Sequence, residues 1–60
     1  MKPLIKARKA LEKAGYILKR RSGHDIYYHP ELKKVIPLKR HDFDENDLQY
    51  ILDEIEKNNR

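Results

Sequence analysis

Residues 16–30 read YILKRRSGHDIYYHP and contain two β-favouring runs on either side of the turn-forming pair Ser22-Gly23. The first run, residues 16–22, begins with apolar side chains and continues into three cations. The second run, residues 24–29, ends at Pro30, which has no N–H to donate to a sheet ladder. Two runs with so short a connection predict an antiparallel hairpin.

A third, short strand is expected over residues 35–38, after a turn at 30–33. Pro37 within it indicates that this strand lies at an edge of the sheet or ends there. Three consecutive strands with short connections imply an antiparallel meander.

A helix is expected before the strands, over residues 4–14. Its apolar residues have the spacing of one buried helix face, which Ile5 widens: Leu4, Ala7, Leu11 and Ala14. Pro3 suits the first turn, where a missing N–H costs nothing. Gly15 is a natural stop, because glycine takes the left-handed conformation at a helix end without strain.

A second helix is expected after the strands, over about 44–58, and it has the clearest pattern in the chain. Its apolar stripe consists of Leu48, Ile51, Leu52 and Ile55. Asp44 is a good N-cap, with Asp42 as the alternative. With Asp44 as the cap, Phe43 and Leu48 fall at the positions of a hydrophobic staple. Tyr50 falls off the stripe and is expected to be half exposed.

The expected order is therefore α-β-β-β-α, an α+β fold in a single domain over residues 1–60. A three-stranded antiparallel sheet this small has to cover one face with both helices, and its other face stays open. This layout resembles the double-stranded-RNA-binding domain, which reads the shape and backbone of RNA.

The net charge of +4 conceals a division between the two ends of the chain. Residues 1–40 hold 12 Lys and Arg against 3 Asp and Glu, a net of +9, whereas residues 41–60 hold 2 against 7, a net of −5. The cationic part suits a polyanion such as RNA, although a lysine-rich surface also serves solubility alone. The acidic residues at the start of the second helix complement its positive end.

Several classes of protein are excluded or disfavoured by composition. The chain has no cysteine, so it has no disulfide, thiolate zinc site or thiolate nucleophile, which fits a cytoplasmic protein. No apolar run approaches the roughly 20 residues of a membrane span, and the N-terminal segment lacks the apolar core of a signal peptide. His24, Asp25 and His29 match no zinc signature, so neither a metal nor a cofactor is expected.

Residues 19–30 carry the groups that RNA cleavage requires. His24 at a strand start is the candidate catalytic residue, because histidine moves protons near neutral pH. The cations Lys19, Arg20 and Arg21 precede it and would hold a phosphate. Tyr28 is a candidate for stacking on an unpaired base. By residue type alone, an exposed polar histidine and packed tyrosines are the more common interpretation.

Further cations follow the hairpin, and they are candidates for contacts with the RNA backbone: Lys33, Lys34, Lys39 and Arg40. The alternative for each of them is a solvated side chain. His29 is expected to hold the turn next to Pro30, and His41 to be a solvated loop residue.

The chain resembles the HicA-like (YcfA-like) family of mRNA interferase toxins over nearly its whole length. The family pattern is glycine and an aromatic after the first helix, a basic strand, a glycine–histidine step, an aromatic, His-Pro, an apolar-proline step and Ile-Leu in the last helix. The matching residues here are Gly15-Tyr16, Lys19-Arg20-Arg21, Gly23-His24, Tyr27, His29-Pro30, Ile36-Pro37 and Ile51-Leu52.

The resemblance implies the toxin of a type II toxin–antitoxin system, an endoribonuclease that cleaves mRNA without a metal. The family's catalytic histidine falls on His24, and the family aromatic at Tyr27 faces the helices, which leaves His24, Ile26 and Tyr28 on the open face. The resemblance also implies an acidic HicB-like antitoxin as a protein partner, covering the open face and His24.

The sequence departs from the family pattern at several places, one of which is a stretch from Gly15 to His24 that is one residue shorter. Ser22-Gly23-His24 inverts the commoner Gly-Ser-His, Lys39 stands where many members have histidine, with His41 two positions later, and Asn46-Asp47 replaces Gly-Thr. These departures favour an alternative, a non-catalytic RNA-binding module with the same fold. A third hypothesis, a protein-interaction domain whose acidic last helix binds a basic partner, rests on the charge division alone.

Overall fold

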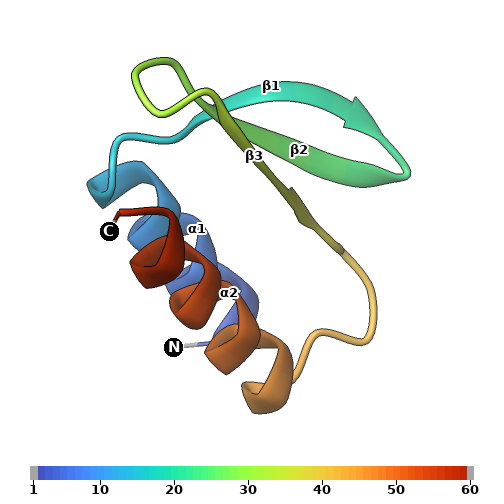
Figure 1. Cartoon of the computed structure of the whole chain (residues 1–60). Coiled ribbons are helices and arrows are strands. Elements are labelled where there is room, and N and C mark those ends of the chain that lie inside the picture. The colour runs from blue at the N-terminus through green and yellow to red at the C-terminus, as the bar shows by residue number, and fades with distance from the viewer. Residues whose placement is uncertain (1, 60) are drawn as a thin grey trace.

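A computed structural model of the chain describes residues 2–59, and at Ser22 it describes the backbone alone. The elements are α1 (Pro3–Lys13), β1 (Ile17–Ser22), β2 (His24–His29), β3 (Lys34–Leu38) and α2 (Glu45–Asn58) (Figure 1). The predicted α-β-β-β-α order is confirmed, and the element boundaries lie within one residue of those expected. Met1 and Arg60, included in the predicted domain, lie outside the described residues.

The molecule has two layers, a sheet and a pair of helices. The three strands form an antiparallel meander in the order β1-β2-β3, so β2 is central. Both helices lie side by side against one face of this sheet (Figure 1). Pro37 stands on the edge strand β3, opposite Ile26, as the sequence predicts.

The register of the hairpin contains an irregularity that the sequence did not reveal. Leu18 pairs with Tyr27 and Arg20 pairs with Ile26, so Lys19 is the extra residue of a bulge. Arg20 consequently shares the open side of the sheet with Ile26. Arg21, paired with buried Asp25, falls on the helix side.

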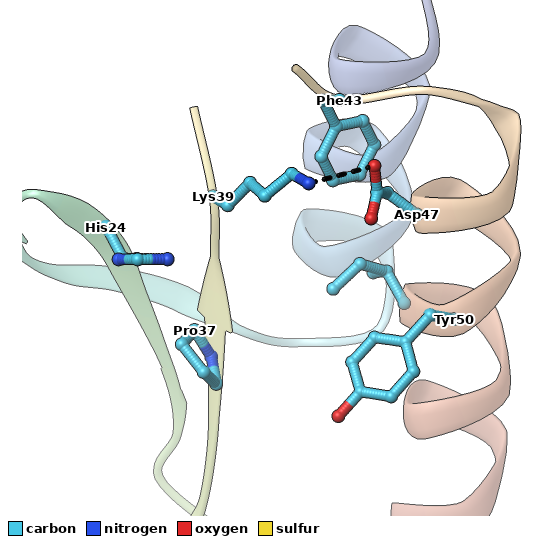
Figure 2. A pocket seen from close by; sticks show the side chains of 7 residues that line it. His24, Pro37, Lys39, Phe43, Asp47 and Tyr50 are labelled. Carbon is cyan, nitrogen blue, oxygen red and sulfur yellow. Dashed lines mark ion pairs between the residues drawn. The ribbon is translucent and has the colours of Figure 1, made fainter. Parts of the chain in front are cut away.

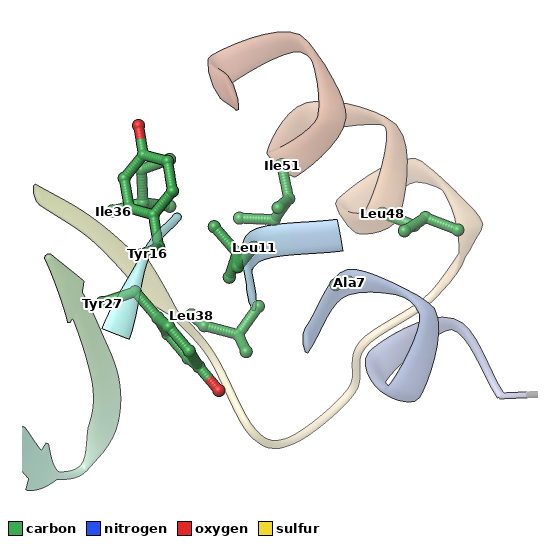
Figure 3. Packing of buried hydrophobic residues seen from close by; sticks show 8 residues of the cluster. All are labelled: Ala7, Leu11, Tyr16, Tyr27, Ile36, Leu38, Leu48 and Ile51. Carbon is green, nitrogen blue, oxygen red and sulfur yellow. The ribbon is translucent and has the colours of Figure 1, made fainter. Parts of the chain in front are cut away.

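The core lies between the layers and draws on every element except β1 (Figure 3). Its buried members are Ala7, Leu11, Tyr16, Tyr27, Ile36, Leu38, Leu48 and Ile51. Two predicted members are wrong: Ile5 is 42% exposed and Leu52 is 37% exposed. Each helix has only one helix beside it, so its outer flank faces solvent and the buried stripe is narrower than the sequence pattern. Tyr50 is 60% exposed.

The end of α1 explains why the chain needs glycine at position 15. The N–H of Gly15 donates to the carbonyl of Glu12, and the N–H of Tyr16 donates to that of Leu11, which is a Schellman motif. This motif requires a left-handed residue, and Gly15 has φ +97°. It also turns Tyr16 back over Leu11 into the core.

The start of α2 is fixed by a capping box. Asp44 is the N-cap, and its Oδ1 accepts from the backbone N–H of Asp47, while Asp47 Oδ2 accepts from the N–H of Asp44, both at 3.0 Å. This decides between the two predicted caps, since Asp42 lies outside the helix with φ +54°. Leu48 belongs to the core and the partly buried Phe43 packs against the core, consistent with the predicted staple. Over residues 2–59, neither helix is long and apolar enough to cross a bilayer.

Candidate functional site

His24 stands just beyond a turn of one residue at the tip of the hairpin. Ser22 and His24 are paired across the turn, and Gly23 between them has φ +73°. The last pair between β2 and β3 joins Asp25 to Leu38, so His24 extends past the end of β3. Its exposed side chain lines hollows that also involve Pro37 of β3, the segment that follows β3, and α2.

Two adjoining hollows meet at His24. The larger, of about 180 Å³, lies between the end of the sheet and the first turns of α2 (Figure 2). It is lined by His24, Pro37, Lys39, Phe43, Asp47, Tyr50 and Ile51. The smaller, of about 150 Å³, is lined by Gly23, His24, Lys39, Arg40 and His41. His24 and Lys39 line both hollows, so a ligand in either one would meet an imidazole and an ammonium group.

An ion pair crosses the larger hollow. Lys39 Nζ lies 3.3 Å from Asp47 Oδ2 (Figure 2). The hydrogen bond from the backbone of Asp44 lowers the pKa of Asp47, and Lys39 lowers it further. Asp47 is therefore a stable anion in the hollow that His24 also lines, and it neutralises part of the cationic charge there.

Asp25 is the most deeply buried charged residue that the structure describes, with an exposure of 0%. Its Oδ2 lies 2.7 Å from Arg8 Nη1 of α1, and its Oδ1 lies 3.6 Å from Arg40 Nε. Neither contact has the geometry of a hydrogen bond, so the carboxylate is held by charge. Arg40 Nε also donates a hydrogen bond to the carbonyl of Gly23 at 3.2 Å. Asp25 thus connects α1, the hairpin tip and the segment after β3.

The contacts of Arg8 in this arrangement raise the pKa of its guanidinium group. Burial acts to lower the pKa of Arg8, but its contacts with the Tyr27 hydroxyl and with Asp25 outweigh burial and raise the pKa. Arg8 Nη1 donates to the Tyr27 hydroxyl at 3.4 Å. In the sequence alone, Asp25 is a candidate only as a metal ligand. The available signal was strand alternation, which places Asp25 on the helix side together with Tyr27.

The predicted RNA-binding cations divide into separate groups. Lys19 and Arg20 line a third hollow, of about 450 Å³, on the open face with Ile26 and Val35. Lys19 Nζ lies 4.5 Å from the centre of the Tyr28 ring, a cation–π contact. This group is continuous on the open face, and none of its members lines the two hollows at His24.

Arg21 is paired with Asp25 near the hairpin tip, and the other four predicted cations lie at opposite ends of the sheet. Lys39 and Arg40 line the smaller hollow beside His24, although each also contacts an aspartate. Lys33, in the turn before β3, and Lys34, opposite His29, lie at the far end of β2 from His24. The structure therefore places Lys39 and Arg40 at the candidate catalytic histidine, and not Lys33 or Lys34.

His29 has a structural role, as the sequence analysis expected. Its Nδ1 accepts a hydrogen bond from the backbone N–H of Leu32 at 3.1 Å, which holds the turn after β2. Its ring also packs edge-on against Tyr16, with centroids 5.1 Å apart. Within residues 2–59, no three histidine or carboxylate side chains are grouped so as to hold a metal ion.

Comparisons of the chain with known protein families, with curated proteins and with solved structures gave no match.

Proposed function

We propose that the chain is an endoribonuclease of the HicA-like kind, a toxin that cleaves mRNA in the cytoplasm with His24 as a catalytic residue. The observation that carries this proposal is the position of His24, exposed beside Lys39 at the junction of two hollows. Hydrolysis of RNA needs a group that transfers protons near neutral pH and a cation at the phosphate, and these two side chains supply them.

The position of Lys39 refines the mechanism expected from the sequence. Lys19, Arg20 and Arg21 are the cations that the sequence predicts at the phosphate, but none of them lines the two hollows at His24. Lys39 lines both hollows that contain His24. An ammonium group has three N–H donors, so Lys39 retains donors for a phosphate oxygen while it contacts Asp47. We therefore assign the phosphate at the cleavage point to Lys39, and the flanking RNA to Lys19, Arg20 and Tyr28.

The test compares the wild-type chain with His24→Ala in a bacterial host. Induction of the wild type is expected to stop growth and degrade mRNA, and the variant is expected to do neither. His24 is exposed, so the variant should retain the circular dichroism spectrum and unfolding midpoint of the wild type. Lys9→Ala, which removes an exposed cation from α1, is the matched control and should remain toxic. Full toxicity of a folded His24→Ala variant would exclude the proposed role.

A second function, RNA binding without cleavage, is favoured by the Lys39–Asp47 ion pair and by the separate cationic open face. It predicts that the purified chain binds RNA with an affinity that falls as salt rises. His24→Ala would leave this affinity unchanged, whereas removal of Lys19 would lower it. No cleavage product would form with either variant or with the wild type.

The open face also supports the proposal of an acidic HicB-like antitoxin as partner. Ile17 and Val35 are 54% and 53% exposed there, next to the cations Lys19 and Arg20. Apolar contacts at the centre with cations around them suit an acidic partner surface. Coexpression with the neighbouring reading frame should give a stable complex, and Val35→Asp should weaken it. A complex unaffected by Val35→Asp would place the partner elsewhere.

A further inference from the structure

Two of the three histidines, His24 and His41, line the smaller hollow. His24 comes from the hairpin tip, and His41 comes from the segment between β3 and α2. The chain has three histidines, and the third, His29, holds the turn at the other end of β2. His41 is exposed and shares the hollow with Lys39 and Arg40. Two imidazoles and two cations therefore line one cavity of about 150 Å³.

We infer that His41 is a second catalytic residue, which acts with His24 as an acid–base pair on one phosphodiester of RNA. This inference rests on the proposed ribonuclease function and adds the residue that completes its proton transfers. One imidazole takes the proton of the 2′-hydroxyl, and the 2′-oxygen forms a bond to phosphorus. The bond from phosphorus to the 5′-oxygen breaks, and the other imidazole, protonated, gives its proton to that oxygen. The products are a 2′,3′-cyclic phosphate and a 5′-hydroxyl.

The hollow provides what this reaction requires besides the two imidazoles. Lys39 and Arg40 line it, and they would offset the negative charge that develops on the phosphate. Arg40 is oriented by Asp25 and by the carbonyl of Gly23, so its position is fixed before RNA binds. Lys39 has its ion pair with Asp47, with 3.3 Å between Nζ and Oδ2.

The charged groups that share a hollow with one or both imidazoles come from the segment after β3 and from α2. Lys39 and Arg40 belong to the segment after β3, and Asp47 belongs to α2, while Asp42 follows His41 in the chain. Histidine is the one type among these whose ordinary titration lies between pH 5 and 8. A change of cleavage rate within that range therefore reports the imidazoles.

The experiment measures cleavage of a DNA oligonucleotide that contains one ribonucleotide, between pH 5 and 9, by the purified full chain. The wild type should give a bell-shaped profile and a 2′,3′-cyclic phosphate product. His24→Ala and His41→Ala should each lower the rate by roughly 10²- to 10⁴-fold and each remove one limb of the bell. Lys9→Ala should keep the wild-type rate and profile.

A second substrate, a uridine 3′-aryl phosphate, shows which imidazole is the acid. Its phenolate leaves without a proton, so the variant that lacks the acid should regain most of the wild-type rate, and the other should not. Wild-type rate and profile in His41→Ala, with His24→Ala inactive, would overturn the pair while the ribonuclease function stands. Absence of cleavage by the wild type would overturn both.

Discussion

Arg40 donates a hydrogen bond from Nε to the carbonyl oxygen of Gly23, 3.2 Å away, and so joins the segment after β3 to the tip of the hairpin. The same nitrogen lies 3.6 Å from Oδ1 of the buried Asp25. His24 stands between Gly23 and Asp25 in the chain. The two residues on either side of the candidate catalytic histidine are therefore held by one guanidinium group.

Asp25→Asn should destabilise the fold by about 3 kcal/mol, since loss of one partner from a buried ion pair costs roughly 3–5 kcal/mol. The lower end of this range applies because Arg8 and Arg40 can still be solvated without the carboxylate. Their side chains are 29% and 37% exposed. A domain of this size has a stability of only about 3–9 kcal/mol. Urea denaturation measures the loss. An unchanged midpoint would show that the buried charge adds nothing to stability.

Gly15→Ala should cost more stability than Gly23→Ala, although both glycines have positive φ. A Cβ at Gly15 would lie 2.8 Å from His29 Nε2, whereas a Cβ at Gly23 meets nothing within 4 Å. Gly23→Ala should therefore lower the stability only by the backbone strain, about 1 kcal/mol. Gly15→Ala should lower it by the same strain and, in addition, by the free energy needed to displace His29. Thermal unfolding of both variants gives the comparison. Equal losses would mean that His29 moves aside freely.

Asp47 should make stability depend on acid pH. Its folded pKa is lowered, so its contribution is fully present above its ordinary value of about 3.8 and is lost as pH falls through the lower folded pKa. The difference in unfolding free energy between the wild type and Asp47→Asn should therefore be constant above pH 5 and shrink toward pH 2. A difference that persists at pH 2 would contradict the assignment to the carboxylate.

Asp47→Asn should also strengthen RNA binding, because it frees the Lys39 ammonium group from its anionic partner. Lys39→Ala should weaken binding and reduce its salt dependence by about one phosphate contact. Lys9→Ala on α1 also removes one positive charge and is the control. Fluorescence anisotropy with a labelled oligonucleotide, over a range of salt concentrations, measures all three. If Lys39→Ala and Lys9→Ala change the RNA affinity equally, Lys39 is not part of the RNA-binding site.

The local patterns predicted the elements, because each depends on residues close together in sequence. The stop at Gly15, the cap at Asp44 and the edge position of Pro37 were all expected and are all present. The exposure of Ile5 and Leu52 was not expected, since it depends on how much of each helix the small sheet covers.

The candidate site was predictable only in part. His24 was identified from the family resemblance and the nearby cations, but its neighbours depend on long-range geometry. The contacts of Asp25 join three segments that are distant in sequence, and no local pattern encodes them. His41 lines the same hollow as His24 from the segment that follows the end of β3 at Leu38. The bulge at Lys19 arises from strand pairing, which the sequence of β1 alone does not fix.

Both edge strands of the sheet carry a residue that disturbs regular backbone hydrogen bonding. This disfavours pairing of an edge strand with a strand of a second copy of the chain. β3 carries Pro37, which has no N–H for a further strand, and β1 carries the bulge at Lys19, which breaks the regular spacing of its free groups. Edge-to-edge addition of a second copy is disfavoured on either side. A small cationic protein whose open face carries exposed apolar and cationic side chains is thereby protected from polymerising through its backbone while that face stays accessible.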